Sequence, residues 1–238
     1  MLSPPLATVA TLNALLNFAT KEGYCQTNPL QGIPRRKPAK QKGEHLEDDP
    51  IRYLTPQQLQ TLYQVVRDNP RLNAIVHLLH RSGARIQEIL NLDLNQLDSQ
   101  NRKFKVIGKG NKTRWCFYSQ DAAQALQKYI RFYRAKDHEA LFTACHPLTK
   151  KVTRLSYDTV HNDWQNTIAQ SPELTGIRLH DLRHTFATER VGLMGIEELR
   201  ALMGHASIQT TLRYQKVTSA RAEEVAQTAL LKLTQAEK

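Results

Sequence analysis

Two histidines in the segment RLHDLRHTFATER, residues 178–190, have the spacing of metal ligands on one helical face. A zinc protease helix carries two histidines four apart, with a glutamate directly after the first. Here Asp181 follows His180, and Arg183 places a cation beside His184, which disfavours a bound dication. A guanidinium and an imidazole together are instead suited to an anion such as a phosphate. The segment alone equally allows a surface arginine between two histidines that pack in a core.

A second group of chemistry-bearing residues lies in HRSGARIQEILNL, residues 80–92. Arg85 follows a Gly-Ala pair that lets the chain turn, so its guanidinium can point into a cleft. Glu88 comes three residues later, and we expect its carboxylate to hold that guanidinium in place. An ordinary exposed ion pair within one helix, worth about 0.2–0.5 kcal/mol, has the same pattern.

Two further segments carry a lysine and a tyrosine. In VIGKGNKTR, glycines flank Lys109 and predict a hairpin tip whose ammonium could protonate a leaving oxygen. The spacing of a phosphate-binding loop is missing there, and a solvated turn has the same sequence. In LMGHASIQTTLRYQKV, His205 follows a glycine and Tyr214 comes nine residues later. Tyrosine is a covalent nucleophile, weak at its free pKa near ~10, and the alternative is a packed ring that donates to the backbone.

The elements that must position these residues are mostly helical. Thr55, Pro56 and Gln58 form a capping-box start. Residues 93–118 alternate differently and predict a strand followed by a hairpin with its tip at GKGNK. Helical spacing of apolar residues recurs elsewhere, at about 8–20, 72–79, 154–169, 179–191, 195–203, 207–214 and 218–235. The predicted fold class is therefore mostly α with a small antiparallel β-sheet, an α+β arrangement.

The charge of the chain points to a polyanionic partner. The net charge is +11 and the pI is near 9.7, which is the footprint expected of nucleic-acid binding. No run approaches the ~20 apolar residues that span a bilayer, and the N-terminus lacks a basic secretory start. The three cysteines are scattered and predict neither a disulfide framework nor a zinc site. We therefore expect a cytoplasmic protein that does not enter a membrane.

Basic residues gather in GIPRRKPAKQK, residues 32–42, which contains no acid and two prolines. This composition predicts an extended linker that could follow a phosphate backbone, although a merely solvated linker fits equally well. From this linker and the hairpin we expect the DNA contacts to include Arg35, Arg36, Lys37, Lys40, Lys42, Lys112 and Arg114.

Together, these motifs resemble the tyrosine recombinase family, also called phage integrases, and especially its Xer-like prokaryotic members. The resemblance covers roughly residues 50–218. Ala84 and Met203 differ from the residues that are common in the family, without changing the chemistry. Every position of the family's catalytic set is filled in chain order, namely by Arg85, Lys109, His180, Arg183, His205 and Tyr214.

The resemblance also divides the chain. Residues 46–238 correspond to a catalytic domain of the tyrosine recombinase fold, with a helical C-terminal tail. Residues 1–45 resemble only the last helix and the linker of the core-binding domain that precedes it in the family. The chain would then be a shortened form or a naturally short relative. The tail could dock on a neighbouring subunit or on its own domain.

The reaction implied by the resemblance is a transesterification at a DNA phosphate. Tyr214 attacks the phosphorus, giving a 3′-phosphotyrosine and a free 5′-hydroxyl that Lys109 protonates. Arg85 and Arg183 neutralise the non-bridging oxygens. Two arginines and a lysine can supply the charge that metal ions supply elsewhere, so we expect no metal and no other cofactor.

The resemblance implies different roles for the histidines and the acids. His180 and His205 would donate hydrogen bonds to the phosphate, and His180 is expected to handle the Tyr214 proton. Glu88 and Asp181 are expected to support these groups, and His184, on the next helical turn, to be structural.

The expected partner is double-stranded DNA with a specific recombination site. The family implies a homotetramer on DNA and a monomer or weak oligomer in solution. One alternative is a type IB topoisomerase, which shares the chemistry but only relaxes supercoils. The other is a non-catalytic DNA-binding relative.

Overall fold

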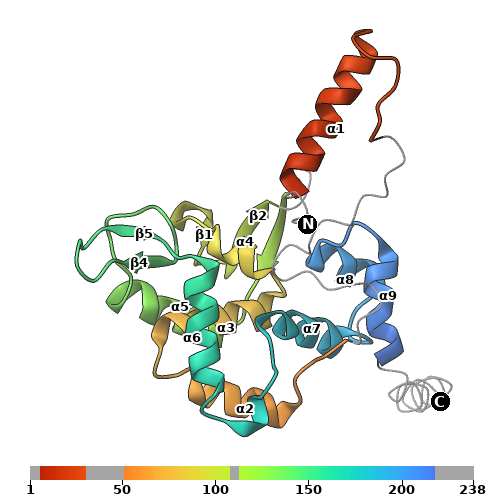
Figure 1. Cartoon of the computed structure of the whole chain (residues 1–238). Helices are drawn as coiled ribbons and strands as arrows, with labels where there is room; N and C mark the ends of the chain where they lie inside the picture. Colours follow the sequence, from red (N-terminus) through yellow and green to blue (C-terminus); the bar gives the residue numbers. More distant parts are fainter. Residues whose placement is uncertain (1–5, 31–50, 108–112, 218–238) are drawn as a thin grey trace, which may run out of the picture. The chain divides into compact units, whose positions relative to one another are not determined.

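The computed structural model describes residues 6–30, 51–107 and 113–217, and the chain divides into two compact units, residues 1–49 and 50–238 (Figure 1). The first unit contains helix α1 (Leu6–Lys21). After Gly23, which has a positive φ, the chain turns back so that the Asn28 amide donates to Asn13 Oδ1 at 2.8 Å and Asn17 Oδ1 at 2.6 Å. These bonds hold the turn on its own helix.

The second unit is mostly helical, as predicted. Helix α3 contacts both α5 and α7, and its buried face supplies much of the larger apolar core. Short 3₁₀ turns at Leu94–Gln96 and Pro172–Leu174 join longer elements. Up to residue 217, the described α-helices are α2 (Pro56–Val65), α3 (Pro70–Ser82), α4 (Ile86–Leu90), α5 (Gln120–Phe132), α6 (Tyr157–Ile168), α7 (Leu179–Arg190), α8 (Ile196–Met203) and α9 (Ile208–Val217).

Among the described residues of this unit there are two antiparallel sheets, where the sequence predicted one. The first has the order β1 (Leu97–Asp98), β2 (Lys103–Ile107), β3 (Thr113–Phe117). Its inner face buries Phe104, Val106 and Cys116. The second pairs β4 (Thr143–Cys145) with β5 (Val152–Arg154), so that α6 starts at Tyr157 rather than near residue 154.

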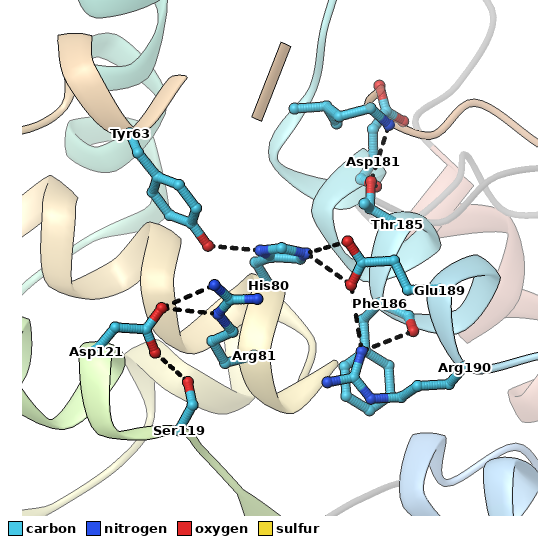
Figure 2. Close-up of polar contacts among 11 residues, drawn as sticks. Tyr63, His80, Arg81, Ser119, Asp121, Asp181, Thr185, Phe186, Glu189 and Arg190 are labelled. Carbon is cyan, nitrogen blue, oxygen red and sulfur yellow. Dashed lines mark hydrogen bonds and ion pairs between the residues drawn. The ribbon is translucent and has the colours of Figure 1, made fainter. Parts of the chain in front are cut away.

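A partly buried chain of polar contacts joins α2, α3 and α7 (Figure 2). The His80 ring, 1% exposed, lies with Nδ1 2.5 Å from the Tyr63 hydroxyl and with Nε2 3.1 Å from both carboxylate oxygens of Glu189. Next to it, Arg81 on α3 pairs with Asp121 on α5 at 2.8 Å. These contacts anchor the last turn of α3 immediately before the segment that carries Arg85.

A smaller apolar cluster lies where α7, α8 and α9 meet. It consists of Phe186, Ala187, Val191, Leu199, Met203 and Tyr214. Tyr214 is thus packed as a core residue, 3% exposed. This burial raises the pKa of its hydroxyl group.

Candidate active site

The turn after α3 places Arg85. Gly83 has φ +64°, and a Cβ there would lie 2.4 Å from a ring carbon of Phe186. The turn therefore requires both the left-handed backbone and the missing side chain of glycine. Arg85 caps α4, donating its backbone N–H to Glu88 Oε2 at 2.7 Å and its Nη1 to Glu88 Oε1 at 3.0 Å.

Glu88 is shared between two arginines. Arg114 on β3 donates Nη1 and Nη2 to the two Glu88 oxygens at 2.8 and 2.7 Å, and its Nε donates to the Leu202 carbonyl at 3.0 Å. Burial alone would raise the pKa of Glu88, but the hydrogen bonds and charge of Arg114 and the Arg85 backbone N–H lower it to about 2. Glu88 therefore stays ionised and holds both guanidinium groups.

These bonds show what Arg114 contacts within the protein. Its side chain is 13% exposed, and the predicted contact of Arg114 with DNA stays a prediction. Three of its N–H groups are directed at Glu88 and Leu202, so the guanidinium is used inside the protein. Arg114 is thus a positioning residue that ties the hairpin to α4 and to the end of α8.

Arg183 lies deeper than Arg85. Its side chain is 2% exposed and donates to the backbone carbonyl of Gly83 and, at 2.6 Å, to that of Met203. Burial, and then the charge of Arg85, lower the pKa of Arg183 to about 9, so it remains a cation at neutral pH. The two bonds use one N–H on each terminal nitrogen and join the ends of α3 and α8.

A second glycine turn places His205. Gly204 has φ +65°, and a Cβ there would lie 2.8 Å from Nη1 of Arg114. The His205 Nδ1 is 2.9 Å from the Thr211 hydroxyl. Burial, and then the charges of Arg183 and Arg85, lower the pKa of His205 to about 3, so the imidazole is neutral. If Thr211 donates to Nδ1, the proton sits on Nε2, which becomes the donor.

Sequence reasoning missed Thr211, although a signal was available. It lies three residues before Tyr214 and therefore on the same face of α9. Its side chain is fully buried, so its hydroxyl needs a partner, and the His205 ring provides one.

Tyr214 meets a different histidine from the one predicted. Its hydroxyl lies 2.8 Å from Nδ1 of His184, and its ring is parallel to that of His205 at 6.3 Å between centroids. His180, to which we assigned the proton, lies edge-on against His184 with centroids 4.7 Å apart. Burial raises the pKa of Tyr214 despite the lowering effect of Arg183 and Arg213. The raised pKa keeps the hydroxyl protonated at neutral pH, and His184 is the imidazole that contacts it.

Asp181 orders the start of the helix that carries these histidines. It is 2% exposed, accepts the Arg178 backbone N–H at 2.9 Å and pairs with the Arg178 guanidinium at 3.1 Å. The side chain therefore acts as the acid of a capping box on α7. Its contribution to the site is to orient α7.

Some predicted residues lie outside the described ranges. They are Lys109 and Lys112 of the hairpin and Arg35, Arg36, Lys37, Lys40 and Lys42 of the basic segment. Within residues 6–30, 51–107 and 113–217, no group of three or more His, Cys, Asp or Glu side chains is arranged to hold a metal ion. No helix in the part of the chain that the structure describes is long and apolar enough to cross a membrane.

The Tyr214 hydroxyl lies beside the His184 imidazole, and the charges of Arg183, Arg213 and Arg85 act on it. A tyrosine beside an imidazole and cations is a grouping suited to phosphoryl transfer. The sequence pattern of the phage integrase family matches residues 52–221, and the chain belongs to that family. A protein described as tyrosine recombinase XerC, from Haemophilus influenzae, is 30% identical over 226 residues, which cover 91% of this chain and 71% of the relative.

Solved structures of this family share the fold. The XerA recombinase superposes with a TM-score of 0.63 at 22% identity, over 95% of this chain and 76% of that one. The XerH site-specific recombinase, bound to a palindromic difH substrate after cleavage, gives a TM-score of 0.61 at 20% identity over 75% and 53%. The architecture around Tyr214 is thus that of tyrosine recombinase catalytic domains.

Proposed function

We propose that this protein is a site-specific DNA recombinase in which Tyr214 is the nucleophile. The observation that carries the proposal is the 2.8 Å contact between the Tyr214 hydroxyl and Nδ1 of His184, at a site that also holds Arg183 and His205. A core tyrosine has no structural need for two histidines and a buried cation around its ring. These groups are the ones that a pentacoordinate phosphorus, with negative charge building on its non-bridging oxygens, requires.

The proposed chemistry conserves the phosphodiester bond. The Tyr214 oxygen attacks the phosphorus while its proton passes to His184, and the bond to the 5′-oxygen breaks. The product is a 3′-phosphotyrosine and a 5′-hydroxyl, with Lys109 proposed as the source of the leaving-group proton. Arg85, Arg183 and His205 stabilise the charge that builds on the non-bridging oxygens. Attack by another strand's 5′-hydroxyl reverses the step and exchanges strands.

The surroundings of Tyr214 and Arg183 bear on how the nucleophile becomes reactive. The Tyr214 side chain is buried and protonated, and both terminal nitrogens of Arg183 bond to carbonyls at helix ends. A phosphate that enters the site can accept hydrogen bonds from the remaining N–H groups of Arg183. Its negative charge would oppose the lowering of the His205 pKa by burial. We infer that DNA binding, rather than folding, produces the reactive nucleophile.

The proposed partner is double-stranded DNA that carries a recombination site, bound by a homotetramer. In this arrangement residues 46–238 act as the catalytic domain, and residues 1–45 correspond to the end of a core-binding domain. The basic segment at 32–42 would follow the phosphate backbone, consistent with the net charge of +11.

A suicide substrate, nicked next to the scissile phosphate so that religation fails, tests the proposal. The wild-type chain should form a covalent adduct with it that survives denaturing electrophoresis, with EDTA present throughout. Tyr214→Phe should lose the adduct but bind the same DNA within about twofold, since only the hydroxyl is removed. An adduct with the Phe variant, or a strict need for a divalent cation, would overturn the proposal. Relaxation of supercoils without recombination of paired sites would instead favour the topoisomerase alternative.

A further inference from the structure

The outer face of the β2–β3 hairpin carries exposed aromatic side chains. Strand alternation turns Phe104, Val106 and Cys116 inward and leaves the alternate positions outside. On the outside, Ile107 is 56% exposed, Trp115 44% and Phe117 52%. Other large exposed apolar residues of this unit, such as Leu148, Leu193 and Phe132, lie on separate elements, whereas these three share one sheet face.

On that face, lysines of β2 lie opposite the aromatic rings of β3. The register pairs Lys105 with Trp115 and Lys103 with Phe117. The Lys103 ammonium lies 4.6 Å from the centroid of the Trp115 ring, close enough for a cation–π contact. Asp98 lies 3.7 Å from the Lys103 ammonium, and Lys105 is exposed. The surface therefore combines flat rings with positive charge.

A surface of this kind suits unpaired nucleic acid better than protein. Bases stack on aromatic rings with little regard to sequence, and lysines beside the rings neutralise phosphates. At a protein interface, the same lysines would have to lose water inside an apolar contact, which is why lysine is depleted there.

The position of the face fits the same partner. Arg114 and Trp115 are neighbours on β3, so their side chains point to opposite faces of the strand. The Arg114 side binds Glu88 and thus the active site. A strand freed at the active site would have to unpair from its complement before it could join a new one, and it could reach the outer face by passing round the edge strand β3.

We propose that the outer face of the β2–β3 hairpin binds single-stranded DNA, with bases stacked on Trp115 and Phe117 and phosphates on Lys103 and Lys105. The proposal rests on the proposed function, because recombination is the step that produces an unpaired strand. In this proposal, the outer face of the hairpin holds the unpaired strand between cleavage and rejoining.

Tryptophan fluorescence reports directly on this face. The chain has two tryptophans, and Trp164 is fully buried with its Nε1 donating to the Ile177 carbonyl. Quenching by an added oligodeoxythymidylate of about 20 nucleotides should therefore come from Trp115. We expect saturable quenching by this single strand and much weaker quenching by a blunt duplex of the same length.

Variants separate stacking from folding and from charge. Trp115→Leu should weaken binding of fluorescein-labelled oligodeoxythymidylate at least about tenfold in anisotropy titrations, whereas Trp115→Phe should retain most of it. The matched control is Phe132→Leu on α5, which removes another exposed ring beside an arginine, 5.1 Å from Arg131, and should change nothing. Lys105→Ala should lower the salt dependence of binding by about 0.7 in log–log slope.

The same variants distinguish this proposal from the recombinase proposal. Trp115→Leu should form the covalent adduct on the nicked substrate at the wild-type rate but complete less strand exchange. An absence of quenching by the single strand, or an equal loss of binding in Phe132→Leu, would overturn the assignment and leave the Tyr214 adduct test untouched. Self-association without DNA that Trp115→Leu abolishes, measured by sedimentation, would show that a second copy of the chain covers this face and would also overturn it.

Discussion

Arg85 and Arg183 bring the same guanidinium group to the site, but the chain holds them in different surroundings. The Arg85 side chain is 36% exposed and is held by the Glu88 carboxylate, which Arg114 also grips. The Arg183 side chain is buried and is held by the carbonyls of Gly83 and Met203. The position of the Arg85 guanidinium depends on an ion-pair network, whereas that of the Arg183 guanidinium depends on the ends of α3 and α8.

The difference teaches which part of the site can respond to conditions. A carboxylate titrates, so the Arg85 half has a dependence on pH and on the charge of its neighbours. Backbone carbonyls do not titrate, so the Arg183 half changes only if α3, α7 or α8 moves. We therefore expect substitution of Arg183 to affect folding and catalysis together, and substitution of Arg85 to affect mainly catalysis. Loss of the Glu88 charge should change the pH dependence of stability.

The largest expected effect comes from Arg183→Lys. Lysine keeps the charge but cannot donate to both carbonyls in the planar geometry of arginine. We expect adduct formation on the nicked substrate to fall by about a thousandfold or more, with a lower midpoint of urea unfolding. Arg85→Lys is the matched variant, with about a hundredfold loss and an unchanged midpoint. Equal unfolding midpoints for the two variants would contradict the comparison.

Gly83→Ala tests the turn on which both arginines depend. The new Cβ would meet the Phe186 ring and force a left-handed backbone on alanine, so we expect a loss of about 3 kcal/mol or more in the free energy of unfolding. Gly176→Ala is the control, because Gly176 has φ +78° with nothing within 4 Å of a Cβ, and should cost only about 1–2 kcal/mol. Urea unfolding of the two variants measures the difference, and equal losses would show that the contact with Phe186 can relax.

Glu88→Gln removes the charge that holds the exposed half. Because the folded-state pKa of Glu88 is lowered to about 2, its contribution is fully present above an unfolded pKa near 4.5 and is lost as the pH falls through about 2. That shift corresponds to on the order of 3 kcal/mol at neutral pH. We expect the variant to lose stability at pH 7 and to show a flatter dependence between pH 5 and pH 2. A parallel pH curve for wild type and variant would refute this assignment.

The smallest expected effect distinguishes the two histidines of α7. His184→Asn should slow single-turnover adduct formation by roughly tenfold to a hundredfold and remove the limb of the pH–rate profile that belongs to the base. His180→Asn should slow the step but keep that limb, because His184 contacts the Tyr214 hydroxyl. If His180→Asn alone removes the limb, the proton passes by the route that we first predicted.

Much of the fold could be predicted from local pattern. The capping box at Thr55, Gln58 and the helical spacing through α3 and α7 are local signals, and the structure contains these elements. The β4–β5 hairpin was missed because strands of three residues are too short to show a period. The start of α6 was placed early for the same reason, since Arg154 belongs to β5.

The candidate site divides in the same way. The i, i+3 spacing of Arg85 and Glu88 is local, and the predicted contact between them is present. The contact between Arg114 and Glu88 could not be predicted, because the two residues are 26 positions apart. The local sequence of a basic hairpin is the same whether its arginine faces DNA or a carboxylate. The carbonyls that accept hydrogen bonds from Arg183 belong to the backbone, so the side chains of those residues do not reveal them.

The sequence by itself determined which groups are present and their order along the chain, because arginine, histidine and tyrosine carry their chemistry in the side chain. Only the tertiary structure decided which histidine meets Tyr214. His180 and His184 lie one turn apart on the same face of α7, a rise of about 6 Å, and local sequence does not distinguish them. The packing of α9 against α7 sets the position of the Tyr214 hydroxyl along the α7 axis, and this position is next to His184.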